Sequence, residues 1–99
     1  MSIGTSISGN ELTVQVEGRF DFSAHQEFRD AYEKAGSSIN QYVIDMARTS
    51  YLDSSALGML LLLRDHAGGD NANVRIIKCN PDVRRILTIS NFEQLFSID

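Results

Sequence analysis

The sequence predicts an α/β fold: a mixed sheet of four to five strands with helices packed on it, in the order β-β-α-β-α-β-α. Three observations predict it. Apolar and polar residues alternate near the N-terminus, apolar residues recur at helical spacing after residue 23, and two short apolar runs flank a long apolar helix. A strand–helix–strand unit is normally parallel and a hairpin is antiparallel, so the sheet is expected to be mixed.

The first two strands are predicted from alternation and a turn signal. Apolar residues alternate with polar ones from 12 to 16, which is typical of a half-buried strand. Gly9 and Asn10 precede this run, so residues 3–8 are expected to pair with it as a hairpin.

The first helix is expected over residues 24–35, where apolar residues fall at i, i+4, i+7, i+8 and i+11. Ser23 with Gln26 three residues later matches a capping box, which predicts Ser23 as the N-cap. Gly36 supplies the expected C-terminal stop.

The central unit is a strand over 42–46, a loop through Asp53, a helix over 54–67 and a strand over 73–79. The helix is apolar on nearly every face, as expected for a helix buried at the centre of a fold. Its apolar residues cover all sides, so two interpretations stay open: either all of them are core, or some of Leu57, Met59, Leu60 and Leu61 remain exposed as a partner surface. Met59 is the preferred exposed member, since Met suits an adaptable binding surface.

A last helix is expected to start at Asn80 and Pro81, with Asn as N-cap and Pro in the first turn. Residues 95–98 are predicted to add a short final strand. With 99 residues, the chain is expected to form one domain over residues 1–99.

Charge and cysteine content narrow the function classes. The net charge is -4 and the basic residues are scattered, which argues against nucleic acid and against an anionic membrane surface. The single Cys79 predicts no internal disulfide. No signal segment opens the sequence, and the longest apolar run (56–63) is far shorter than the roughly 20 residues that span a bilayer. A cytoplasmic protein is expected.

Residues 51–58 are the most informative stretch because they place the carboxylate of Asp53 and the hydroxyls of Ser54 and Ser55 at a strand-to-helix turn. One interpretation is structural: Asp53 or Ser54 simply caps the helix. The other is functional, because a helix N-terminus stabilises an anion, and a phosphate on Ser54 would add roughly -1.5 to -2 charges. Ser55, about 100° further around the helix axis, is the rival phosphate acceptor, or a second hydroxyl that accepts from the free backbone N–H groups.

Three stretches together resemble the STAS domain family, the sulfate transporter and anti-sigma antagonist fold. They are Asp-Ser-Ser-x-Leu-Gly at 53–58, Gly-Arg-Phe-Asp at 18–21, and the strand-to-helix passage at 79–87. This resemblance implies that Ser54 is phosphorylated and that Asp21 lies at the kinase-binding end. Ala56 departs from the family pattern, which usually has Gly at that position.

The resemblance also implies the partners. They are an anti-sigma factor that is a serine kinase with a histidine-kinase-like ATP-binding fold, and a metal-dependent serine phosphatase. The unphosphorylated protein would bind the anti-sigma factor and free the sigma factor. The sequence predicts partner contacts through five residues: Asp21, Asp53, Ser54, Ser55 and Met59. Two alternatives stay open: regulation of another signalling protein, for example a diguanylate cyclase, or a constitutive scaffold subunit.

Enzymatic activity is not expected. His66 lies twelve residues beyond Ser54 on the same helix, roughly 18 Å away at 1.5 Å per residue, so it cannot serve as a base. Distance along the helix does not exclude His25 as a base for Ser54. However, the sequence lacks the Gly-x-Ser-x-Gly elbow of a hydrolase. One Cys and two distant His do not form a recognised metal-ligand pattern, and no motif requires a cofactor.

Overall fold

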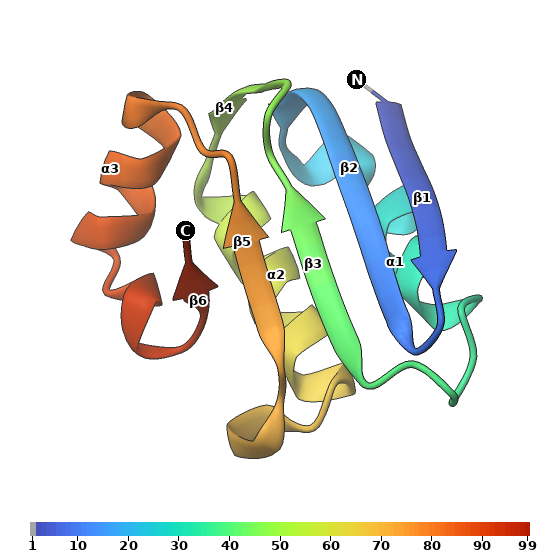
Figure 1. Cartoon of the computed structure of the whole chain (residues 1–99). Coiled ribbons are helices and arrows are strands. Elements are labelled where there is room, and N and C mark those ends of the chain that lie inside the picture. The colour runs from blue at the N-terminus through green and yellow to red at the C-terminus, as the bar shows by residue number, and fades with distance from the viewer. Residues whose placement is uncertain (1) are drawn as a thin grey trace.

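The computed structural model describes residues 2–99 as a six-stranded mixed sheet with three α-helices (Figure 1). The strands follow the spatial order β1-β2-β3-β5-β6, and β4 pairs with the far end of β2. The strands are β1 (Ser2–Ser8), β2 (Glu11–Phe20), β3 (Gln41–Asp45), β4 (Thr49–Leu52), β5 (Val74–Ile77) and β6 (Ser97–Ile98). The helices are α1 (His25–Glu33), α2 (Ser54–His66) and α3 (Pro81–Ile89). The predicted fold class is confirmed.

The predicted hairpin and the parallel unit both form. β1 pairs antiparallel with β2, and β3 pairs parallel with β2 and with β5. The apolar residues of the alternating run are buried, whereas Gln15 and Glu17 are exposed. Alternate side chains of a strand point to opposite faces, so one face of β2 packs on the helices and the other meets solvent.

The loop predicted before Asp53 is wrong in part, because residues 49–52 form strand β4. The Thr49 hydroxyl donates to the Val16 carbonyl over 2.8 Å, which anchors the start of β4 against β2. β4 has four residues, and its two end residues are buried while its two middle residues are exposed. This pattern lacks the alternation by which the other strands are recognised, so no periodic signal marks β4 in the sequence.

The N-cap predicted for the first helix is also wrong. Asp21, not Ser23, accepts the first free backbone N–H, which Ser23 donates over 3.0 Å. The Ser23 hydroxyl donates to the same carboxylate, and the N-cap of α1 itself is Ala24, which has no side-chain hydrogen bond to offer. A short 3-10 turn over Phe22–Ala24 therefore precedes α1. The end of the helix is as expected, since Gly36 has a φ of 89° that disfavours side chains.

The start predicted for the last helix is confirmed. The Asn80 side chain accepts the Val83 N–H over 2.8 Å and Pro81 is the first helical residue. The side-chain NH₂ group of Asn80 donates to the Thr49 carbonyl over 3.0 Å. Asn80 therefore caps α3 and ties it to β4.

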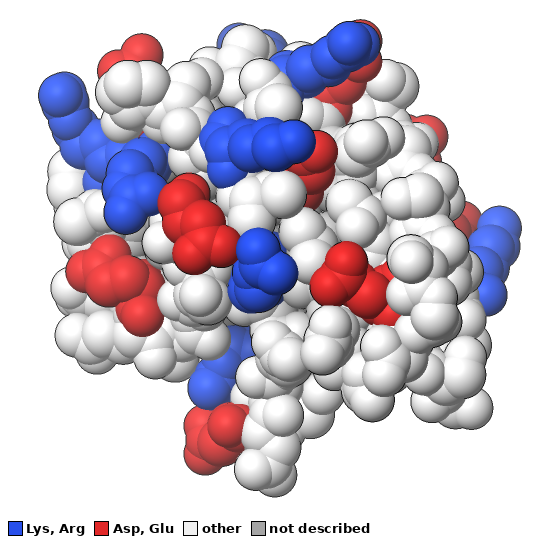
Figure 2. All heavy atoms as spheres, in the orientation of Figure 1, with Lys and Arg blue, Asp and Glu red and all other residues white. Residues whose placement is uncertain are grey.

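The helices cover the sheet unequally. Figure 1 shows α1 and α2 behind the sheet, with the opposite face open toward the viewer. Figure 2 shows that acidic and basic side chains interleave over this open face. The core lies between the sheet and the two helices and includes Phe20, Phe28, Ile44 and Leu60. Within residues 2–99, no helix has both the length and the apolar character that a membrane span requires.

Candidate functional site

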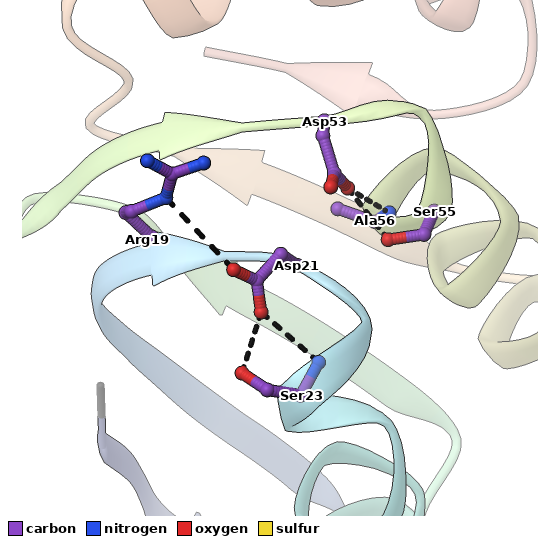
Figure 3. Close-up of polar contacts among 6 residues, drawn as sticks. All are labelled: Arg19, Asp21, Ser23, Asp53, Ser55 and Ala56. Carbon is purple, nitrogen blue, oxygen red and sulfur yellow. Dashed lines mark hydrogen bonds and ion pairs between the residues drawn. The ribbon is translucent and has the colours of Figure 1, made fainter.

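Two strands end side by side at one edge of the molecule. β2 and β4 run parallel, with Phe20 in register with Leu52. The Asp53 N–H donates to the Phe20 carbonyl over 3.3 Å. The next residue of each strand is an aspartate, so the backbone pairing brings Asp21 and Asp53 together, as Figure 3 shows. Two residues that the sequence separates by a helix and two strands thus share one site.

Asp53 is the N-cap of α2. Its Oδ1 atom accepts the Ala56 N–H over 3.1 Å and the Ser55 hydroxyl over 2.6 Å. The hydrogen bond from Ser55, aided by those from the backbone, holds the pKa of Asp53 below its usual value. The carboxylate therefore stays charged at neutral pH and fixes the first turn of α2.

Asp21 repeats this arrangement at the end of β2. Its carboxylate accepts the N–H and the hydroxyl of Ser23, and these bonds lower the pKa of Asp21. The Arg19 Nε atom lies 3.8 Å from Asp21 Oδ2 (Figure 3). The nearby charge of Asp53 acts in the opposite direction and raises the pKa of Asp21. Two aspartates and one arginine thus form a single electrostatic cluster.

The two turns also repeat in sequence. Residues 20–24 read Phe-Asp-Phe-Ser-Ala and residues 52–56 read Leu-Asp-Ser-Ser-Ala. In both turns the first and last side chains are buried, and the serine hydroxyl donates to the aspartate. The middle residues, Phe22 and Ser54, differ in type, but both are exposed.

The structure separates the two candidate acceptors. Ser54 is the exposed first residue of α2, and within residues 2–99 its hydroxyl has no hydrogen-bond partner. Ser55 is half-buried, and its hydroxyl donates to Asp53. The expected role of Ser55, accepting from backbone N–H groups, is replaced by donation to the capping carboxylate. Of the two hydroxyls, that of Ser54 is open to a modifying enzyme.

Three residues outside the predicted contact set also border this site. The Arg19 guanidinium lies over the Tyr51 ring, 5.1 Å from its centroid. Phe22 is 65% exposed and stacks on the His25 ring. The repeated Asp-x-Ser pattern would have drawn attention to Phe22, but Tyr51 lay in a segment predicted as loop.

The predicted exposure of Met59 is wrong, because Met59 is 4% exposed. It lies on the face of α2 that packs against the sheet, together with Leu60 and Leu63. Leu61 and Leu62 are the exposed apolar residues, at 38% and 49%. Since α2 is apolar on nearly every side, helical periodicity could not tell the inner face from the outer.

The remaining chemical groups lie away from this site. The His66 ring is 4.9 Å from that of Tyr32 and 6.3 Å from that of Tyr42, at the opposite end of α2 from Ser54. Cys79 is half-buried, and burial raises the pKa of its thiol. Across residues 2–99, no group of three or more His, Cys, Asp or Glu side chains could hold a metal ion.

Comparison with known proteins gives a consistent result. A family model described as "Mlab, STAS domain" matches residues 3–97. A STAS-domain containing protein of Pseudomonas aeruginosa (strain UCBPP-PA14) is 63% identical over 93 residues, covering 94% of this chain and 92% of that protein.

Solved structures match the fold at low sequence identity. The unphosphorylated anti-sigma factor antagonist SpoIIAA superposes with a TM-score of 0.84 at 16% identity, covering 99% of this chain and 88% of that one. The phosphorylated form of SpoIIAA, a Bacillus cell fate determinant, gives a TM-score of 0.69 at 13% identity, covering 99% and 91%.

Proposed function

Because the chain belongs to the STAS domain family, we propose that it is an anti-sigma factor antagonist that switches partners when Ser54 is phosphorylated. In this proposal the whole chain, residues 1–99, is one cytoplasmic regulatory domain that binds other proteins and catalyses no reaction. The observation that carries the proposal is the state of Ser54: its hydroxyl is exposed and uncommitted, while the neighbouring hydroxyl is held by Asp53.

The position of Ser54 supports phosphorylation without unfolding. A phosphate there would lie at the N-terminal end of a 13-residue helix, where free N–H groups and the helix dipole stabilise negative charge. Asp53 already supplies the cap through Ala56, so the first turn does not depend on the Ser54 hydroxyl. Modification would therefore change the surface and leave the fold intact.

The structural neighbours support a switch of this kind. SpoIIAA has been solved in both an unphosphorylated and a phosphorylated form. Both forms superpose on this chain over nearly its full length. We infer by analogy that this fold accommodates a phosphorylated state here as well.

Electrostatics supplies the proposed mechanism. Asp21 and Asp53 are already charged at neutral pH, and a phosphate on Ser54 would add roughly -1.5 to -2 charges beside them. An acidic partner surface at this point would be repelled by the phosphate. An apolar partner surface would strip water from the phosphate without replacing its hydrogen bonds, which is unfavourable. A loss of about 3 kcal/mol of binding free energy would weaken the affinity more than a hundredfold.

The proposed partners are a serine kinase that is also the anti-sigma factor, with a histidine-kinase-like ATP-binding fold, and a serine phosphatase. The proposed contact surface includes Asp21, Asp53, Ser54 and Ser55. Met59 is not part of it because its side chain is buried. The exposed Leu61 on the same helix takes its place.

Phosphorylation is tested by intact mass measurement after incubation with candidate kinases and ATP. We expect a single added phosphate on the wild type and none on Ser54→Ala. Ser55→Ala removes the neighbouring hydroxyl and alters the contact surface, but it should still gain one phosphate. A phosphate that persists on Ser54→Ala and maps to Ser55 would contradict the assignment.

Partner switching is tested by comparing how Ser54→Ala and Ser54→Asp bind the phosphorylating kinase. Ser54→Ala is expected to bind like the unmodified wild type, and Ser54→Asp more weakly, although one carboxylate imitates a phosphate imperfectly. Equal binding by wild type, Ser54→Asp and phosphorylated protein would end the switch proposal and leave a constitutive interaction module.

A further inference from the structure

Strand β1 forms a long free edge of the sheet. It pairs with β2 along one side through all seven of its residues, without a bulge, and no other strand of residues 2–99 pairs with its second side. Its sequence, Ser-Ile-Gly-Thr-Ser-Ile-Ser, contains no charged residue and no proline. Such an edge presents unpaired N–H and C=O groups and is a template for another strand.

The other edges within the described residues are protected. β6 has two residues, and Arg75 in the neighbouring β5 forms an ion pair with Asp99 beside it over 3.1 Å. β4 has four residues, and Asn80 at the start of α3 donates to its Thr49 carbonyl. Short strands, charged side chains and covering elements are the usual means of blocking edge-to-edge pairing. β1 has none of these.

The sequence of β1 is nearly palindromic about Thr5. Read from either end it gives Ser, then Ile, then a small residue, with Thr5 at the centre. In an antiparallel pair of two identical strands centred on Thr5, Ile3 of one copy would face Ile7 of the other, and Thr5 would face itself. Threonine–threonine and β-branched pairs are favourable across antiparallel strands, and no like charges would meet.

From this edge and its palindrome, we infer that β1 pairs antiparallel with β1 of a second copy of the chain, giving a continuous sheet across a two-fold axis. Ile3, Thr5 and Ile7 lie opposite buried residues of β2, so they share the face that carries the helices. Ile7 is 56% exposed in the single chain and would gain an apolar neighbour in the pair. The inference is independent of phosphorylation at Ser54.

The pairing is expected to be weak and reversible. One pair of seven-residue strands buries far less than the roughly 1,600 Å² of a standard interface, so we expect a Kd on the order of 100 µM. β1 has no charged side chain of its own, and the charged side chains that Figure 2 shows at the right margin belong to other elements.

The experiment is sedimentation equilibrium of the full chain from about 10 µM to about 1 mM, a range that brackets the expected Kd. The wild type should show a monomer–dimer equilibrium. Thr5→Lys should weaken it at least about tenfold, because like charges would meet across the two-fold axis. Thr5→Glu alone should do the same, and an equimolar mixture of the two variants should recover the dimer.

Thr88→Lys is the matched control, since it changes an exposed threonine on α3 and alters the net charge equally. It should dimerise like the wild type, and circular dichroism should show all variants folded. A wild type that stays monomeric at the highest concentration would overturn the inference. So would a dimer that Thr5→Lys leaves unchanged, or a mixture that fails to recover association.

Discussion

The turn at residues 20–24 and the turn at residues 52–56 share one hydrogen-bond pattern but lead into different helices. Each follows one of two paired parallel strands, and in each an aspartate accepts a hydrogen bond from the serine two residues later. The first opens a three-residue 3-10 turn before the nine-residue α1, whereas the second opens directly into the 13-residue α2. Comparing the two turns distinguishes the residues that stabilise each turn from the residue that each turn exposes to solvent.

The parts that the turns share are structural. The buried ends of each turn anchor it in the core, and the Asp-x-Ser pair satisfies backbone and hydroxyl groups locally. The middle residue contributes to neither task. It is Phe22 in one turn and Ser54 in the other, and both side chains are exposed. The middle residue of each turn is therefore expected to contribute little to stability, and the other residues most of it.

The largest expected effect is at the buried first positions, Phe20 and Leu52, which are both fully buried. Phe20→Ala should cost about 3–5 kcal/mol of unfolding free energy and Leu52→Ala about 2–5 kcal/mol. Phe20 should cost more, because its ring also packs on Phe28 with centroids 5.0 Å apart. Urea unfolding measures both, and a loss below about 1 kcal/mol at either position would show that this turn is not anchored in the core.

The next effect distinguishes the two caps. Asp53→Ala should lower the urea midpoint more than Asp21→Ala, because Asp53 caps an α-helix and Asp21 a short 3-10 turn. Asp82→Ala, an exposed aspartate in the first turn of α3 that is not its N-cap, serves as the control. Equal decreases in the urea midpoint for Asp53→Ala and Asp21→Ala would mean that the stability contributed by a cap does not depend on the length of the helix that follows it.

The two carboxyls should also make stability depend on pH in the acid range. Their pKa values lie below the ordinary 3.8 in the folded protein, so the unfolded chain binds protons first as the pH falls. Their contribution is complete above the unfolded pKa and is lost as the pH falls through the folded values. Urea midpoints of the double variant Asp21→Asn with Asp53→Asn should therefore fall less between pH 5 and 2 than those of the wild type. Parallel wild-type and variant curves would contradict this.

Much of this arrangement could be predicted from local sequence, because strands and caps leave short-range signals. Alternation around Val14 predicted β2, and Asn80 before Pro81 predicted α3. The signal failed where a contact between distant segments decides the structure. The Thr49 hydroxyl donates to the Val16 carbonyl, 33 positions away, and this hydrogen bond anchors β4. No residue near Thr49 in the sequence indicates that this bond forms.

In the candidate site, too, local sequence predicts some features, whereas contacts between distant segments decide the others. The position of Ser54 at a helix start follows from local sequence, but its exposure relative to Ser55 depends on which hydroxyl Asp53 accepts. Met59 was misplaced because α2 is apolar all round, and the inner face is chosen by the sheet. The proximity of Asp21 to Asp53 required the parallel pairing of β2 with β4.

The smallest expected effect on stability is at the middle of the first turn. Phe22→Ser should change the unfolding free energy by no more than about 0.5 kcal/mol, because Phe22 is already 65% exposed and its stacking partner His25 is only half-buried. Urea unfolding of this variant beside Ser54→Ala tests it. A loss above about 1 kcal/mol would show that Phe22 helps to hold α1. A neutral result would mean that the chain keeps a large aromatic side chain in water beside Ser54 with no benefit to folding, as expected of a residue retained for binding.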